Sequence, residues 1–294
     1  MFTLPSIKDE YKRDGVPCVR IENCGNFSVH KTFDCGQAFR FDPDGDDDTF
    51  TGTAFGKKIT FSSLGGGVVE LRGSTAEEYG KTWQRYLSLD SDYDEADRVI
   101  IESMPNERDR TEMSAAVDSG RGIRILRQDP FETLISFIIS QNNNIPRIKK
   151  IISALCERYG ENGAFPTADA LVEAGEEGIF ALKTGFRAGY IYDAAVKVKT
   201  GEVVLDDIAK CEDYEKCTDM LCSIKGVGPK VSSCVLLFGF GKTEAFPIDV
   251  WMKRSLALHF PDGFDPKPLG KYAGIAQQYM FYHERWINSE STKK

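Results

Sequence analysis

The residue pattern changes near residue 75, and this change constrains the fold more than any other feature of the chain. Before it come runs that are rich in Phe, Thr and Val, alternate in part and are broken by glycines, as in 27–41, 49–63 and 63–74. Such runs are typical of β-strands joined by hairpins. We therefore expect an antiparallel sheet in the first part of the chain.

Beyond residue 75 the apolar residues recur at helical spacing. Phe131, Leu134, Ile135 and Ile138 would share one face of a largely buried helix. Further helices are expected at 146–159, 167–174, 187–200, 212–223, 230–238, 249–260 and 268–287. The pattern predicts an α+β protein, with a β-sheet domain over 1–115, a helical domain over 116–294 and a boundary somewhere in 75–120.

The charge balance does not by itself favour nucleic acid. The chain has 294 residues, with 37 Lys and Arg against 45 Asp and Glu, so the net charge is −8. The charges are unevenly placed, however. Acid gathers in 41–48 and 90–97, whereas 121–150 and 225–254 are locally basic. A basic patch can bind what the average charge repels, and we expect the acidic loops to lie away from it.

The eight cysteines are scattered without a paired framework. No secretory signal is seen, so we expect reduced thiols in a cytosolic compartment. Cys211, Cys217 and Cys222 are also open to interpretation as a metal cluster, although no histidine lies near and two gaps are unusual for zinc. No apolar run of about 18 residues occurs, which predicts no membrane span.

The stretch "IKGVGPKVSS" (224–233) predicts a helix, a tight glycine turn and a second helix. Gly226 and Gly228 permit positive φ and a close approach of the backbone to a ligand. Pro229 suits the first turn of the second helix, where exposed N–H groups and the helix dipole form an anion site. A plain corner between two helices with a glycine cap is an equal alternative on the turn alone.

Nineteen residues after Lys230 comes "FPIDVWMKRSL", in which Asp249 is placed to cap the next helix. One helix and one loop would bring Lys230 and Asp249 to the same end of a helix pair. An amine and a carboxylate that converge beside a phosphate-binding turn suggest chemistry on a nucleic-acid sugar. An ordinary N-cap is the alternative for Asp249.

Several motifs carry a resemblance to a known family. They are "CGQAFRF", "GIRILRQDPFETLISFIISQNNNIPRI", "TGFRAGYI", "IKGVGPKVSSCVLLFGFGKTEAFPIDVWM" and "YAGIAQQYMF", in that order between Phe33 and Phe281. Together they resemble the 8-oxoguanine DNA glycosylases of the eukaryotic type, within the helix-hairpin-helix/Gly-Pro-Asp superfamily. The resemblance implies a twisted antiparallel sheet packed on a helical domain, in agreement with the pattern above.

The resemblance implies catalytic roles for two residues. Lys230 would attack C1′ of an extruded nucleotide and expel the base, and β-elimination from the resulting Schiff base would nick the strand. A helix N-terminus and partial desolvation both favour the neutral amine that this attack needs. Asp249 would stabilise the oxocarbenium-like charge while capping its helix.

Further residues are implied to hold the lesion base. Cys234 would pack against it and form a dipolar pair with the lysine, with a small buried hydrophobe as the alternative. The carbonyl of Gly36 would accept the N7–H that 8-oxoguanine has and guanine lacks, because the wrong base leaves it facing a lone pair. Gln277 would read the Watson–Crick edge and Phe281 would stack on the base; both are otherwise routine members of the last helix.

Another group is implied to contact the base opposite the lesion. Asn142, Arg147 and Arg187 match these residues, and two arginines suit an acceptor-bearing cytosine edge, so we expect a preference for cytosine. Phe186 occupies the wedge position, where an aromatic ring fills the gap in the stack.

Contacts with the DNA backbone are implied for Asn143, Gly226, Gly228, Val231 and Trp251. Trp251 stands where family members commonly carry histidine, which leaves a single N–H donor there. The carbonyls of Cys222, Ile224 and Val227 would hold a monovalent cation. No further cofactor is expected, and no iron–sulfur cluster, since no cysteine follows Cys234.

We expect a monomer that binds double-stranded DNA containing 8-oxoguanine, in a prokaryotic nucleoid within the cytoplasm or in a eukaryotic nucleus, with no membrane partner. Two alternatives stay open. A non-enzymatic helix-hairpin-helix module requires only the glycine turn. A glycosylase for another lesion, such as an alkylated base without an N7–H, would gain nothing from the carbonyl of Gly36.

Overall fold

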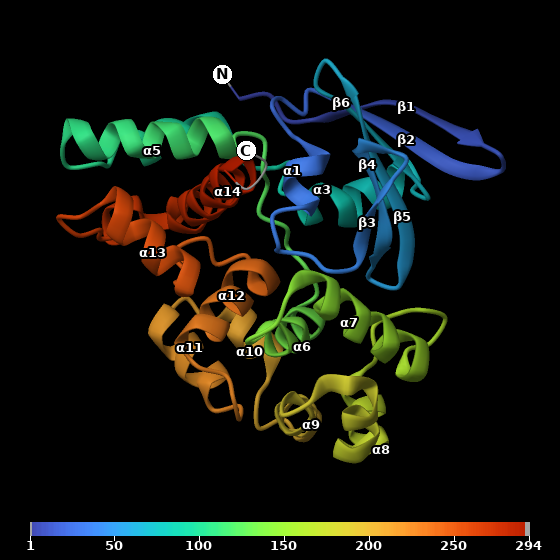
Figure 1. Cartoon of the computed structure of the whole chain (residues 1–294). Helices are drawn as coiled ribbons and strands as arrows, with labels where there is room; N and C mark the ends of the chain where they lie inside the picture. Colours follow the sequence, from blue (N-terminus) through green and yellow to red (C-terminus); the bar gives the residue numbers. More distant parts are fainter. Residues whose placement is uncertain (1, 292–294) are drawn as a thin grey trace.

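The structure, a computed structural model, describes residues 2–291, without the side chains of 46, 47 and 286–291. Its first part is a six-stranded antiparallel sheet and the rest is helical (Figure 1), which confirms the expected α+β fold. The strands are Ser6–Arg13 (β1), Val16–Glu22 (β2), Phe41–Asp44 (β3), Asp46–Ala54 (β4), Lys57–Gly65 (β5) and Val68–Arg72 (β6). Their order across the sheet is β1-β2-β6-β5-β4-β3.

One face of this sheet is buried because apolar residues of four strands share a register. Phe50 lies opposite Phe61, Phe61 opposite Leu71, and Leu71 opposite Val19. All four are buried, and Phe33 stacks on Phe61 with ring centroids 5.2 Å apart. The row forms the centre of the first of two cores.

Residues 27–41 do not form the strand expected there, and that prediction was wrong. Ser28 caps a short helix, α1 (Val29–Phe33), by accepting a hydrogen bond from the Lys31 N–H at 3.2 Å. Val29 and Phe33 are buried at helical spacing. Gly36 then turns the chain with φ +81° before β3 begins. The alternation of polar and apolar residues hid a capped helix and a loop.

In the helical part, each predicted range contains a helix, but the helix expected at 167–174 continues to Ile179, and the helices at 93–102, 107–120 and 205–210 were not predicted. Its longer helices are Tyr93–Glu102 (α4), Glu107–Gly120 (α5), Pro130–Ser140 (α6), Ile145–Tyr159 (α7), Ala168–Ile179 (α8), Arg187–Thr200 (α9), Tyr214–Cys222 (α11), Pro229–Phe240 (α12), Val250–His259 (α13) and Ala273–Ser291 (α14). Shorter ones are Ala76–Glu78 (α2), Gln84–Tyr86 (α3) and Leu205–Lys210 (α10). Within residues 2–291 we find no helix with the length and apolar character that a bilayer span requires.

The two cores meet around the segment that links the sheet to the helices. Trp83 and Leu89 pack with the sheet, whereas α4 and the helices after it form the second core. The chain returns to the sheet core at Leu126, and Phe39 of the sheet part enters the helical core. The two parts are therefore interlocked, and the site described below lies where they meet.

Candidate active site

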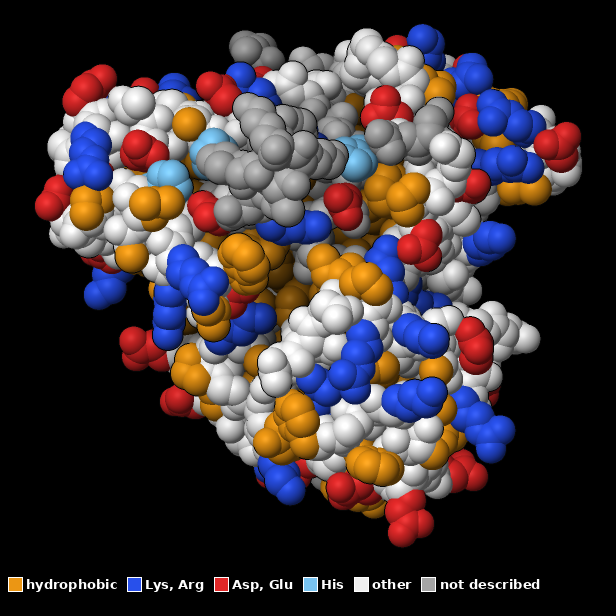
Figure 2. All heavy atoms as spheres, viewed as in Figure 1, with side chains coloured by type: hydrophobic (Ala, Val, Ile, Leu, Met, Phe, Trp, Pro, Cys, Tyr) orange, Lys and Arg blue, Asp and Glu red, His pale blue; other side chains and the backbone are white. Residues whose placement is uncertain are grey.

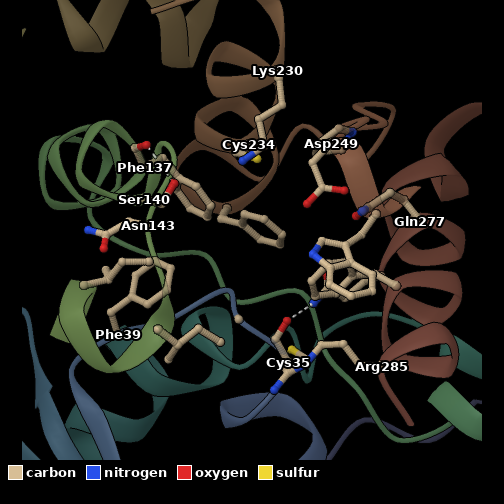
Figure 3. A pocket seen from close by; sticks show the side chains of 18 of the residues that line it. Cys35, Phe39, Phe137, Ser140, Asn143, Lys230, Cys234, Asp249, Gln277 and Arg285 are labelled. Atoms are coloured by element: carbon tan, nitrogen blue, oxygen red, sulfur yellow. Dashed lines mark hydrogen bonds between the residues drawn. The ribbon is translucent and has the colours of Figure 1, made fainter. Parts of the chain in front are cut away.

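A cavity of about 390 Å³ opens between the loop after α1 and the helices α6, α12 and α14, a volume typical of small-ligand pockets. Figure 2 shows a hollow in the middle of this face, with apolar side chains inside it and Lys and Arg side chains around and below it. In Figure 3, Lys230 and Cys234 enter from one helix, Asp249 lies beside them, and Gln277 comes from α14. The cavity thus collects side chains from segments far apart in the sequence.

The turn between α11 and α12 has the geometry of an anion site. Gly226 has φ +79°, and a Cβ there would lie 2.2 Å from the Tyr190 ring, so only glycine fits. Gly228 begins α12 without a side-chain cap, and Pro229 stands in the first turn. Within residues 2–291, the N–H groups of Gly226, Gly228, Lys230 and Val231 have no acceptor. These donors, at the positive end of the helix dipole, suit a phosphate.

Lys230 is half-buried in the first turn of α12, and its ammonium lies 5.6 Å from the centroid of the Phe137 ring. Cys234 follows one turn later and is 4% exposed. Burial raises the pKa of the Cys234 thiol, and the ammonium of Lys230, which acts in the opposite sense, does not offset it. The thiol is therefore neutral, which suits a packing surface for a planar group.

Asp249 caps α13, as its position before the helix predicts. One carboxylate oxygen accepts a hydrogen bond from the Met252 N–H at 2.8 Å. Asp249 also lines the cavity together with Lys230. A single oxygen is enough for the cap, so the second remains available to a charge that develops inside the cavity.

The opposite wall carries the residues assigned to base recognition. Gln277 is 5% exposed, and its side-chain oxygen is buried without a hydrogen-bond partner among the described residues. A buried acceptor in this condition is costly unless a ligand satisfies it. Phe281 is half-buried, and one of its ring carbons lies 3.8 Å from where a Cβ of Gly36 would stand. An apolar ring, a free acceptor and the backbone of Gly36 thus line one side of the cavity.

The residues assigned to the opposite base lie together around the loop 142–144, called the rim because Asn143 and Asn144 line the cavity, but they differ in the contacts they make. Arg187 is 2% exposed and donates to the carbonyls of Thr184 (3.1 Å) and Asn142 (2.9 Å), as well as to that of Gln141. Arg147 is exposed and reaches a single carbonyl, that of Lys183, at 3.4 Å. The buried arginine holds the loop, and the exposed one faces solvent.

The rim also carries exposed aromatic groups. Phe186 is 58% exposed, and the Arg187 guanidinium lies 4.4 Å from the centroid of its ring. Asn142 is exposed with φ +47°, whereas Asn143 donates to the Ile139 carbonyl at 3.0 Å. Trp251 is 49% exposed and lines the cavity mouth.

Several residues that line or support the site went unnoticed in the sequence. Phe137 is a buried residue of α6, Ser140 ends that helix half-buried, and Tyr190 lies under the glycine turn. Gln278 and Arg285 extend the contribution of α14. For Gln278 and Arg285 the only signal in the sequence is that they lie close to Gln277. The other residues look like ordinary core or surface residues of a helix.

The possible metal ligands are side chains near the cysteines and backbone carbonyls of the glycine turn. Within residues 2–291, no group of three or more His, Cys, Asp or Glu side chains could hold a metal ion, and the alternative of a cysteine cluster gains no support. Among backbone carbonyls, Ile224 accepts the Val227 N–H at 3.0 Å, whereas those of Cys222 and Val227 accept no hydrogen bond from the described residues. Asp42, in the acidic segment 41–48, pairs with Lys149 at 2.7 Å. That this segment lies away from the glycine turn stays a prediction.

Two family models match the chain. The one described as "8-oxoguanine DNA glycosylase, N-terminal domain" matches residues 21–134, and "HhH-GPD superfamily base excision DNA repair protein" matches residues 135–268. The division falls within α6 and differs from the division of the cores described above.

Similar curated proteins and solved structures carry names of the same kind as these two family models. The chain is 39% identical over 155 residues to the N-glycosylase/DNA lyase of Saccharomyces cerevisiae, covering 46% of this chain and 41% of that protein, less than half its length. It is 32% identical to the probable N-glycosylase/DNA lyase of Methanothermobacter thermautotrophicus, covering 59% and 67%. The Clostridium acetobutylicum 8-oxoguanine glycosylase/lyase, solved with DNA containing cytosine opposite 8-oxoguanine, is 35% identical with a TM-score of 0.85, covering 98% and 99%.

Proposed function

Because the chain belongs to the 8-oxoguanine DNA glycosylase family of the helix-hairpin-helix/GPD superfamily, we propose that it is a bifunctional DNA glycosylase/AP lyase that excises 8-oxoguanine. The observation that carries the proposal is the convergence of Lys230, Asp249 and Gln277 on one cavity beside a glycine turn with free N–H groups. The enzyme acts in base excision repair, wherever the host keeps its DNA, and works as a monomer.

The cavity receives the lesion outside the duplex. A base inside the stack cannot be reached, so the nucleotide is extruded at a cost of a few kcal/mol. The free N–H groups of the turn hold a phosphate of the lesion strand, and the exposed ring of Phe186 fills the gap left in the stack. Asn143 and Trp251 complete the contacts with the DNA backbone.

Lys230 is the nucleophile. Its neutral amine forms a bond to C1′ as the bond from C1′ to N9 breaks, and the electron pair of that bond leaves with the base. Loss of the amine protons and opening of the sugar give an imine, and removal of a C2′ proton then expels the 3′ phosphate. Asp249 supports this step through charge, because its free carboxylate oxygen offsets the positive character that develops at C1′.

The cavity walls recognise the extruded base. The neutral Cys234 thiol packs on one face of the purine, and the ring of Phe281 packs on the other. The unpaired oxygen of Gln277 accepts a hydrogen bond from the Watson–Crick edge. The carbonyl of Gly36 accepts the N7–H, a contact that guanine cannot make.

The opposite base is read at the rim, and we propose a preference for cytosine. Arg147 is exposed and contacts a single carbonyl, so it can turn to the acceptors of a cytosine edge. Arg187 would have to give up hydrogen bonds to backbone carbonyls before it could contact the cytosine. Asn142, whose carbonyl accepts from Arg187, is the third residue proposed to contact the opposite base.

We also propose a monovalent cation at the hairpin. The carbonyls of Cys222 and Val227 are without donors among the described residues, and that of Ile224 accepts a single hydrogen bond, so all three retain lone pairs. These oxygens suit a hard cation. A cation held by these carbonyls would add positive charge at the turn and so favour a DNA phosphate there.

The test uses a duplex with 8-oxoguanine opposite cytosine and borohydride. We expect the wild-type protein to release the base, nick the strand and form a covalent adduct, and Lys230→Gln to lose all three activities. Lys225→Gln removes an exposed lysine of the same turn and serves as the matched control. An adduct in Lys230→Gln, or none in the wild type, overturns the proposal.

A further inference from the structure

Residues 34–37, around the turn at Gly36, carry four consecutive carbonyls. Side chains donate hydrogen bonds to three of them. Arg285 donates to the carbonyl of Asp34 at 2.8 Å, Gln278 to that of Cys35 at 2.8 Å, and Gln128 to that of Gln37 at 2.8 Å. Among the residues and side chains that the structure describes, none donates a hydrogen bond to the carbonyl of Gly36. The loop therefore leaves one acceptor free, and it belongs to a residue that lines the cavity.

The loop is fixed on its sheet side through the side chain of Gln37. This side chain donates to the carbonyls of Thr32 at 2.9 Å and Arg124 at 2.8 Å, and it accepts from the Leu126 N–H at 2.9 Å. Gln37 is 1% exposed, so these bonds are shielded from water. The residue after Gly36 consequently has little freedom to move.

On the helical side, α14 fixes the residue before Gly36. Gln278 is 3% exposed, and its bond to Cys35 is the dashed line at the Cys35 carbonyl in Figure 3. Once the Cys35 carbonyl is turned to α14, the peptide plane between Cys35 and Gly36 is set. The positive φ of Gly36 lets the next carbonyl point away from its neighbour.

The neighbour of Gln278 in the helix is Gln277, whose side chain enters the cavity. Consecutive side chains of an α-helix diverge by about 100°. Two adjacent glutamines of one helix therefore serve different ends. Gln277 lines the cavity, and Gln278 holds the loop to which Gly36 belongs.

We propose that Gln278 is a positioning residue for lesion discrimination: by holding the Cys35 carbonyl it directs the Gly36 carbonyl toward the N7 side of the extruded purine. The inference rests on the proposed function and adds to it a residue that does not touch the base. A role confined to filling the core would affect stability without changing which purine is preferred.

The experiment compares two purines that differ at N7. In the Lys230→Gln background, which binds without cutting, affinity is measured for duplexes carrying 8-oxoguanine or 8-methoxyguanine opposite cytosine. Both bases carry an oxygen at C8, and only the first has an N7–H. We expect Gln278→Met, which removes the donor at similar volume, to reduce the preference for 8-oxoguanine about tenfold.

The matched control is Tyr279→Phe in the same helix. It removes a buried hydrogen bond to Asp97 of 3.0 Å without touching the loop. We expect it to lower stability and to keep the purine preference within about twofold. In a protein that retains Lys230, it should also keep nicking at a preformed abasic site. Gln278→Met should also keep that nicking.

Three outcomes separate the claims. If the Lys230→Gln parent prefers 8-oxoguanine and Gln278→Met keeps that preference, or loses it no more than Tyr279→Phe does, the role of Gln278 is wrong while the proposed function stands. A guanine duplex is measured alongside: if the parent binds 8-oxoguanine no more tightly than guanine, the proposed function fails and the inference fails with it. If the parent prefers 8-oxoguanine to guanine but not to 8-methoxyguanine, the inference alone is wrong.

Discussion

The two walls of the cavity are built in different ways. The wall with Lys230 and Asp249 comes from two helix starts within one short stretch, one set by Gly228 and Pro229 without a side-chain cap and the other by the Asp249 cap. The wall with Gly36 and Gln277 is assembled from the loop after α1, from α14 and from the segment around Arg124. The groups proposed for bond breaking are thus encoded locally, whereas those proposed for base recognition depend on packing across the whole chain.

This contrast predicts that substitutions on the two walls fail differently. A change at a helix start removes one chemical group and leaves the neighbouring backbone in place. A change among the contacts that hold the Gly36 loop moves a backbone carbonyl without removing it. Substitutions on the Lys230 wall should therefore change mainly the rate of base excision, and those on the Gly36 wall mainly the preference for 8-oxoguanine.

The largest effect should come from Asp249→Asn. Asparagine caps a helix about as well as aspartate, so we expect stability to change by less than about 0.5 kcal/mol. Loss of the negative charge should slow base excision by about 10²- to 10³-fold in single-turnover assays. Asp213→Asn changes the equivalent cap of α11 and is the control, with normal excision expected. Equal loss in both variants would contradict a role for charge at C1′.

The next effect tests whether assembly by packing extends to the opposite-base rim. Arg187→Ala leaves the carbonyls of Gln141 and Asn142 without their donor, and we expect about 2 to 3 kcal/mol lower stability in urea unfolding. Arg147→Ala removes an exposed side chain and should stay within about 0.5 kcal/mol.

The same pair of variants separates support from base reading. With each of the four bases opposite the lesion, Arg147→Ala should lower the preference for cytosine. A stability loss in Arg147→Ala as large as that in Arg187→Ala would break the distinction.

A smaller effect concerns the contact between the two parts of the chain. Glu132 of α6 pairs with Arg40 at 3.2 Å, and burial raises the pKa of its carboxyl to about 7. The folded state then binds a proton that the unfolded state releases, so stability is greatest below the unfolded pKa and falls as the pH rises toward 7.

We expect the free energy of unfolding to fall by about 1 to 2.5 kcal/mol between about pH 5 and 7.5 through this group. In Glu132→Gln the slope should flatten, as measured by urea unfolding at both pH values. An unchanged slope in that variant would assign the pH dependence elsewhere.

The smallest effect should come from Gly36→Ala. The added Cβ makes an ordinary contact of 3.8 Å with the Phe281 ring, but φ +81° is strained for alanine by about 1 to 2 kcal/mol. Relief of that strain would rotate the carbonyl, so excision of 8-oxoguanine should fall about tenfold while nicking of a preformed abasic site is kept. A parallel loss of both activities would point to general damage.

The local features were readable in the sequence, and the long-range ones were not. The glycine turn, the caps at Gly228 and Asp249 and most helices follow from residues a few positions apart. The strand expected at 27–41 failed because its alternation conceals a helix capped by Ser28. Gln278 could not be singled out, since its partner lies 243 positions away and a buried glutamine has no pattern of its own.

Tyr190 lies under Gly226, and its ring is also edge-on to Phe186 at 5.9 Å. The glycine turn, proposed to bind a phosphate of the lesion strand, and the Phe186 ring, proposed to enter the DNA stack, therefore both rest on Tyr190. The distance between the turn and the Phe186 ring therefore depends on one side chain. A substitution that tilts this tyrosine would disturb both contacts at once, even though it touches no nucleotide.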